Sequence, residues 1–159
     1  MFRALLSLAF VAALAVPAAA QDKTGIGVGA EAMLNGPNGA SVVYDADAWR
    51  VNGILGFHDN GAQDVLLGAR FVFVLHEGTG ADFGVGGGFG LVMHDEPGGM
   101  GDNDTTDILI EGLVQLRAFI VPNVALSAAA GLGLVTGDGD DVEVTGQLVG
   151  SVGITYYFW

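Results

Sequence analysis

Apolar residues recur at every second position along most of this chain. The clearest run follows Gly25, where glycines and Glu31 alternate with Ile26, Val28, Ala30, Ala32 and Leu34. A period of two places successive side chains on opposite faces of a strand, so the pattern predicts β-structure. Beyond the first 20 residues, the longest apolar run, 124–135, is too short for a membrane-spanning helix, which needs roughly 20 residues.

This alternation predicts eight strands, at residues 25–34, 42–47, 49–57, 65–73, 83–91, 108–120, 124–134 and 142–159. Segments rich in Gly, Asn, Asp and Pro separate them, and these residues favour turns. Most of these strands have about 9–14 residues, which resembles bilayer-spanning strands more than the shorter strands of soluble sheets. Segment 108–120 also fits a helix, but a lone helix would break the even strand count.

The connections alternate in length. Those after the second, fourth and sixth strands are tight, whereas those after the third, fifth and seventh are longer or more acidic. Outer-membrane barrels have short periplasmic turns and longer external loops. The chain is therefore predicted to form a closed antiparallel eight-stranded up-and-down transmembrane β-barrel. A soluble periplasmic β-sandwich is the alternative fold.

The first 20 residues have the pattern of a cleaved signal peptide. Arg3 precedes the apolar stretch 4–16, Pro17 follows it, and Ala18 to Ala20 supply the small residues before a cleavage site. An uncleaved N-terminal anchor is the alternative. We therefore assign residues 1–20 to the signal and residues 21–159 to a single barrel domain, exported through the inner membrane to the outer membrane.

Composition adds an unusual combination of properties. The formal net charge is −13, yet 51% of residues are apolar, the mean hydropathy is +0.51 and there are 27 glycines. Apolar strands joined by acidic segments reconcile these values. The negative charge argues against nucleic-acid binding, and the absence of Cys excludes disulfides and lipid attachment to a cysteine.

The C-terminal strand ends in aromatic residues at alternating positions, Tyr156 and Phe158, next to Tyr157 and Trp159. With the eight-strand pattern, this ending resembles the OmpA/OmpX-type eight-stranded outer-membrane barrels over nearly the whole mature chain. The resemblance implies recognition of the last strand by the barrel-insertion machinery, and outer-membrane lipid and lipopolysaccharide as surroundings. The chain departs from the usual pattern by ending on Trp159, which leaves the signal's register open by one residue.

Other aromatic residues cluster near predicted strand ends. Six are expected at the periplasmic membrane interface: Tyr44, Trp49, Phe73, Phe83, Tyr156 and Phe158. Phe57 and Phe89 are expected toward the opposite rim. Aromatic belts of this kind mark both interfaces of a membrane protein.

Charged residues also fall on the predicted inner face. An eight-stranded barrel has just enough room for side chains to fill its interior, and inward glycines on the first and fifth strands would accommodate long ones. We expect one lumen charge network, formed by Glu31, Arg70, Glu111 and Arg117, because unpaired buried charges are costly. The rival interpretation is an ion or proton path.

Signals for metal binding and catalysis are weak. Asp102, Asp104, Asp138 and Asp140 have calcium-ligand chemistry but lack the spaced Glu of an EF-hand. No cofactor is expected. No Ser is predicted beside a His, although His58 or His94 at the external rim could serve acid–base chemistry on a lipid.

We therefore expect an outer-membrane barrel with a structural or surface-interaction role, a plugged lumen and no catalytic activity. The alternatives are a lipid-modifying barrel enzyme and the soluble sandwich.

The mature protein should begin at Gln21, because Ala18 and Ala20 occupy the positions that a signal peptidase recognises. Intact-mass spectrometry of the membrane-extracted protein should find residues 1–20 removed. A mass that includes Met1 to Ala20 would contradict the assignment.

Overall fold

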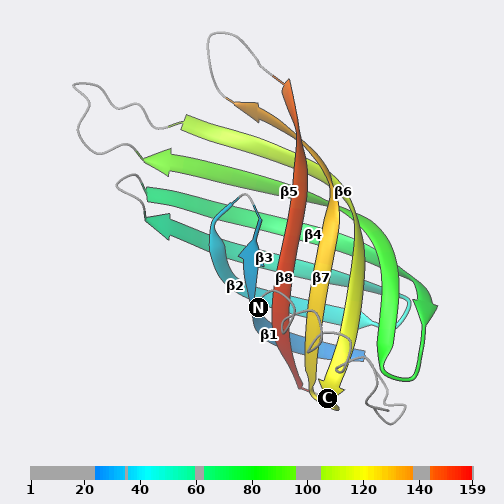
Figure 1. The fold of residues 1–159 in the computed structure, drawn as a ribbon. Coiled ribbons are helices and arrows are strands. Elements are labelled where there is room, and N and C mark those ends of the chain that lie inside the picture. Colours follow the sequence, from blue (N-terminus) through cyan, green and yellow to red (C-terminus); the bar gives the residue numbers. More distant parts are fainter. Residues whose placement is uncertain (1–23, 35, 60–62, 96–104, 138–143, 159) are drawn as a thin grey trace, which may run out of the picture.

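The computed structural model describes residues 24–34, 36–59, 63–95, 105–137 and 144–158. They form eight strands: β1 (Thr24–Met33), β2 (Asn38–Ala46), β3 (Trp49–Asp59), β4 (Gln63–Glu77), β5 (Ala81–Asp95), β6 (Thr105–Val121), β7 (Val124–Gly137) and β8 (Val144–Phe158). Each pairs antiparallel with its sequence neighbour, and β1 also pairs with β8, which closes the barrel (Figure 1). The predicted eight-stranded up-and-down barrel is confirmed, and the sandwich is wrong.

Strand pairing extends several elements beyond the predicted bounds. β2 begins at Asn38 and β4 at Gln63, because both strands continue their ladders into sequence that resembles a turn. Segment 108–120 lies within β6, a strand of 17 residues, so its helical interpretation is wrong. Within the described ranges, no helix is long and apolar enough to cross a bilayer.

The two ends of the barrel differ in their connections. Residues 47–48, 78–80 and 122–123 make tight turns at one end, which we call the short-turn end; we call the other the long-connection end. Asp47 has a φ of 67°, a left-handed conformation that Asp tolerates in a two-residue turn. The wall is taller on the side of β4, β5 and β6, which have 15, 15 and 17 residues, than on the side of β1 and β2, which have 10 and 9 (Figure 1).

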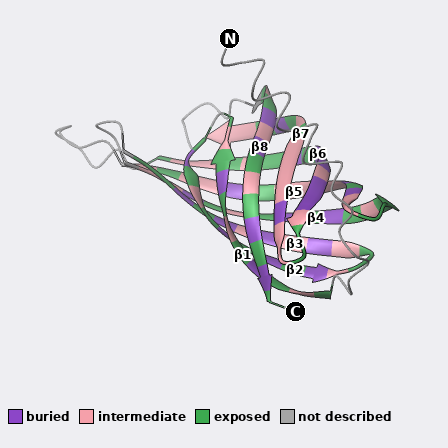
Figure 2. Ribbon diagram, turned by 60° about the horizontal axis from the view of Figure 1, so that its bottom comes forward, coloured by how far each residue is buried: buried purple, intermediate pink, exposed green. Residues whose placement is uncertain are grey.

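Each strand has two faces of opposite chemistry. Buried and exposed residues alternate along the ribbon, as the bands of Figure 2 show. The outer face carries large apolar side chains, with Leu132 73% and Phe57 59% exposed. The inner face carries buried charges, with Arg50 2% and Asp45 0% exposed. This arrangement is the reverse of a water-soluble protein, which keeps charge outside.

The expected signal peptide, residues 1–20, and the proposed first mature residue, Gln21, lie outside the described residues. Trp159 lies outside them as well. The division of the chain at residue 20 stays a prediction.

Candidate functional site

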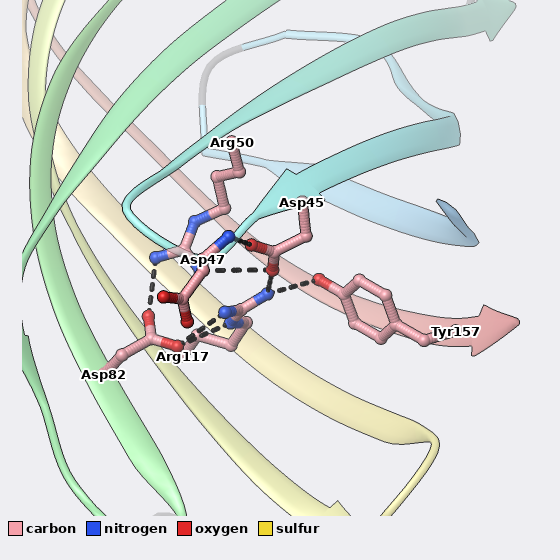
Figure 3. Close-up of polar contacts among 6 residues, drawn as sticks. All are labelled: Asp45, Asp47, Arg50, Asp82, Arg117 and Tyr157. Atoms are coloured by element: carbon pink, nitrogen blue, oxygen red, sulfur yellow. Dashed lines mark hydrogen bonds and ion pairs between the residues drawn. The ribbon is translucent and has the colours of Figure 1, made fainter. Parts of the chain in front are cut away.

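Four charged side chains form a buried cluster near the short-turn end: Asp45, Arg50, Asp82 and Arg117 (Figure 3). We call this group the short-turn cluster. Arg50 Nη2 lies 2.5 Å from Asp82 Oδ1, and Arg117 Nη2 lies 2.6 Å from Asp82 Oδ2. Arg117 Nη1 also donates to Asp45, whose Oδ2 lies 3.9 Å from Arg50 Nη1. Two guanidinium groups therefore face two carboxylates, and the cluster has no net charge.

Aromatic rings seal this cluster on the side of β6 and β8. Arg117 Nη1 donates to the hydroxyl of Tyr157 at 2.7 Å, and its guanidinium carbon lies 4.8 Å from the centre of the Phe119 ring. Phe119 and Tyr157 pack with Val43 and Ala125 in a buried apolar group. The cluster thus combines paired charge with a water-excluding cover.

A second group of polar side chains, the central cluster, lies nearer the middle of the barrel and contains Glu31, Asn52, Arg70, Glu111 and Ser151. Arg70 Nη1 lies 2.9 Å from Glu31 Oε2, and Arg70 Nε lies 2.5 Å from Glu111 Oε1. Arg70 also donates to Ser151 Oγ at 2.8 Å, and Asn52 donates to Glu31. Here two carboxylates face a single guanidinium.

Strand register brings the members of the central cluster together. Asn52, Arg70, Gly88 and Glu111 are successive cross-strand neighbours on β3, β4, β5 and β6. A Cβ at Gly88 would lie 2.5 Å from Glu111 Oε1 and 3.0 Å from Arg70 Cγ. Glycine at this position therefore lets two long side chains meet across the intervening strand, as expected for β5. The inward Gly27 of β1 instead makes room for Thr155 and Tyr157.

The structure corrects the expected single network. Glu31, Arg70 and Glu111 lie together, but Arg117 belongs to the short-turn cluster. Glu111 and Arg117 lie on the same face of β6 six positions apart, which is about 20 Å along a strand. Arg117 instead has Asp82 as its direct cross-strand neighbour.

Sequence reasoning missed Asp45 as a lumen residue. Its signal was present, since alternation through Val43 puts Asp45 on the inner face, and both residues are buried. Register also pairs Asp45 directly with Arg50. The sequence contained no comparable signal that Ser151 and Tyr157 would bond the two arginines, because these contacts depend on how β8 pairs with β1 and β7.

The six aromatic residues expected at an interface lie toward the short-turn end. Tyr44, Phe73, Phe83, Tyr156 and Phe158 are exposed on the outer face, and Trp49 is half-buried. Ring centres are 5.7 Å apart for Tyr44 and Trp49, and 5.2 Å apart for Tyr156 and Phe158. Phe57 lies near the long-connection end of β3, whereas Phe89 lies near the middle of β5, opposite Ala69.

The long-connection rim contains a third group, formed by Asp64, His94 and Asp107. His94 Nδ1 lies 2.7 Å from Asp64 Oδ1, and its Nε2 lies 3.3 Å from Asp107 Oδ2. Donation from both nitrogens requires the protonated imidazolium. In that state His94 has no lone pair with which to accept a proton. His58 is exposed at the rim on β3.

The calcium candidates Asp102, Asp104, Asp138 and Asp140 all lie outside the described residues. Within those described, no group of three or more His, Asp or Glu side chains could hold a metal ion.

Replacing Arg117 with Leu should destabilise the barrel by about 3–5 kcal/mol, because it leaves two buried carboxylates facing only Arg50. Double-mutant cycles separate the two clusters. R117L should couple to D82N by more than about 0.5 kcal/mol, while R117L and E111Q should be additive within about 0.5 kcal/mol. Urea unfolding of the refolded protein, followed by tryptophan fluorescence, gives these free energies. If R117L coupled equally to D82N and E111Q, the two clusters would behave as the single network expected from the sequence.

Comparison with known proteins identifies a structural relative but no sequence relative. No protein-family description matches the chain, and no curated protein matches its sequence. Among solved structures, it resembles the crystal structure of the N-terminal β-barrel domain of Pseudomonas aeruginosa OprF, with a TM-score of 0.64 and 16% identity. The match covers 87% of this chain and 100% of that domain. The chain therefore has the fold of the small eight-stranded OmpA-type barrels, as the resemblance in its sequence predicted.

Proposed function

We propose that this protein is an outer-membrane β-barrel with a structural or surface-interaction role and a lumen plugged by side chains. The observation that carries this proposal is the reversed distribution of charge and apolar surface. Large apolar side chains, including Leu132, Leu148 and Val152, are 58–73% exposed on the outer face. A closed barrel with such a surface is stable when hydrocarbon, and not water, surrounds it.

Two further features support the membrane placement. The exposed aromatic residues toward the short-turn end form one interfacial belt, with Tyr44 and Tyr156 in positions where a polar hydroxyl can reach headgroups. The tight turns then face the periplasm, and the longer connections face outward. The likeness to OmpA/OmpX-type outer-membrane barrels agrees with this orientation.

The plugged lumen is supported by the burial of both clusters. Arg50, Asp82 and Arg117 are at most 3% exposed, and Glu31, Arg70 and Glu111 are at most 7% exposed. Opening a path for ions would separate paired charges inside a narrow barrel, which is costly. The pairing thus favours a structural role over an ion or proton path.

A catalytic role receives less support. His94 is the better placed of the two histidines considered, but carboxylates occupy both of its nitrogens. A general base needs a free lone pair directed at the proton that it removes. The geometry favours a cross-strand link that ties the tips of β4, β5 and β6 together.

The proposed partners follow from the location. Outer-membrane lipid and lipopolysaccharide would surround the apolar face, and the insertion machinery would recognise the aromatic end of β8. Tyr156 and Phe158 point outward on that strand, and their rings pack together. They are the residues through which this recognition would occur.

Single cysteines on β8 should reveal which face contacts lipid, and the natural chain contains no cysteine. Cys at the outward positions Leu148, Val152 and Ile154 should react with a lipid-soluble maleimide in reconstituted membranes. Cys at the inward positions Val149, Ser151 and Thr155 should react several-fold less, because neighbouring strand residues point to opposite faces. Equal labelling of both sets, or no labelling of either, would exclude the transmembrane barrel.

A plugged lumen should not conduct ions. Purified protein in planar bilayers should give no steady current above that of the protein-free membrane, because the paired charges fill the barrel. Protease protection of the same preparation would verify insertion. Sustained open-channel currents from inserted protein would overturn the plug while leaving the outer-membrane location standing.

A further inference from the structure

The half of the barrel interior toward the long-connection end contains a cavity of about 240 Å³. Its walls are mainly aliphatic, with inward side chains Ile54, Leu66, Val92, Leu109, Val135 and Val149. Arg70 and Glu111 of the central cluster form its floor, and Asp64, His94 and Asp107 line its mouth. The cavity therefore has an apolar middle between two charged ends.

The size of the cavity limits its ligand. A dry aliphatic cavity of about 150 Å³ binds benzene, so this space fits a single ring with a short substituent. Gly68 helps to keep it open: a Cβ there would have its nearest contact at 3.5 Å, from Phe89 O. A larger side chain could occupy this inward position, and glycine leaves the space empty of side chain.

The charges at both ends favour a cation. At the floor, Glu31 and Glu111 share one cationic partner among the described residues, Arg70. At the mouth, the ion pairs of the described residues give Asp64 and Asp107 one shared partner, His94. Carboxylates outnumber their cationic ion-pair partners at each end even when His94 is protonated. The potential along the cavity is therefore negative, and low-dielectric walls strengthen it.

The mouth is the better place for a ligand's charge. The floor carboxylates already accept hydrogen bonds from Arg70 and Asn52. The side chains of Asp64 and Asp107 are 25% and 31% exposed, so a cation beside them keeps part of its hydration. Each carboxylate also has lone pairs beyond the one directed at His94.

We propose that the half of the lumen toward the long-connection end binds small organic cations of the single-ring amine class. The ring lies among the aliphatic walls, and the ammonium group lies at the mouth, beside carboxylate lone pairs of Asp64 and Asp107 that are not directed at His94. This binding role goes beyond a structural or surface-interaction role and is compatible with a plugged lumen, because the site lies above the central cluster.

Three ring compounds of nearly equal size test the proposal: benzylamine as cation, benzyl alcohol as neutral analogue and benzoate as anion. The full mature protein, reconstituted in nanodiscs with labelled Ile, Leu and Val methyl groups, is titrated with each compound by NMR. Benzylamine should shift the inward methyls of Ile54, Leu109 and Val149 saturably, with at least tenfold higher affinity than benzoate. The outward methyls of Ile110, Leu148 and Val152 report partition into lipid.

Matched variants then locate the site. G68V should narrow the cavity and weaken saturable benzylamine binding several-fold, whereas G112V, on the outer face with nothing within 4 Å of its Cβ position, should preserve it. D107N should reduce benzylamine affinity several-fold and leave benzyl alcohol affinity unchanged. Asp107 lies at the partly exposed mouth, so D107N should fold. If G68V does not fold, D107N alone tests whether the cation binds at the mouth.

Three outcomes would overturn the proposal: equal affinity for benzoate, full benzylamine binding by G68V, or no loss of cation preference in D107N. A cavity already filled by a lipid acyl chain would leave the inward methyls insensitive to benzylamine and would also overturn it.

Discussion

The narrow interior of an eight-stranded barrel constrains the rest of this structure. Half of the residues of every strand point into a space just wide enough for their side chains. Each long inward side chain therefore needs a small residue beside it, and each inward charge needs an opposite charge within reach. The glycines of β5, the two ion clusters and the remaining cavity are three results of filling the same limited volume.

The central cluster shows how this constraint acts through register. Arg70 and Glu111 lie on strands that are not neighbours, and Gly88 on the strand between them provides no side chain to separate them. A one-residue slip of β5 would replace Gly88 with an outward residue such as Phe89 and remove this gap. Packing inside the barrel thus reinforces the alignment that the alternating pattern specifies.

The sequence predicted the architecture well, because strand count, closure and outward faces depend on local period-two patterns. It predicted the inward positions of Glu31, Arg70, Glu111 and Arg117 for the same reason, but it missed Asp45. It did not predict the division into two clusters, because partners such as Asp82 and Arg117 are chosen by the register between strands. The rim contacts of His94 depend on the same information, as do the bonds from Arg70 and Arg117 to β8.

The bonds of the two arginines also connect distant parts of the chain. Arg117 bonds Asp82, Tyr157 and Asp45, which are 35, 40 and 72 positions away, and Arg70 bonds Ser151 across 81 positions. These arginines acquire their full set of partners only when β1 meets β8. In the proposed membrane setting, a partly closed sheet would turn the guanidinium group of Arg70 toward lipid, at a cost of about 2–4 kcal/mol near the bilayer midplane. Charge pairing and barrel closure are therefore coupled, because closing the sheet brings Asp45 of β2 to Arg117 of β6 on the opposite wall of the barrel.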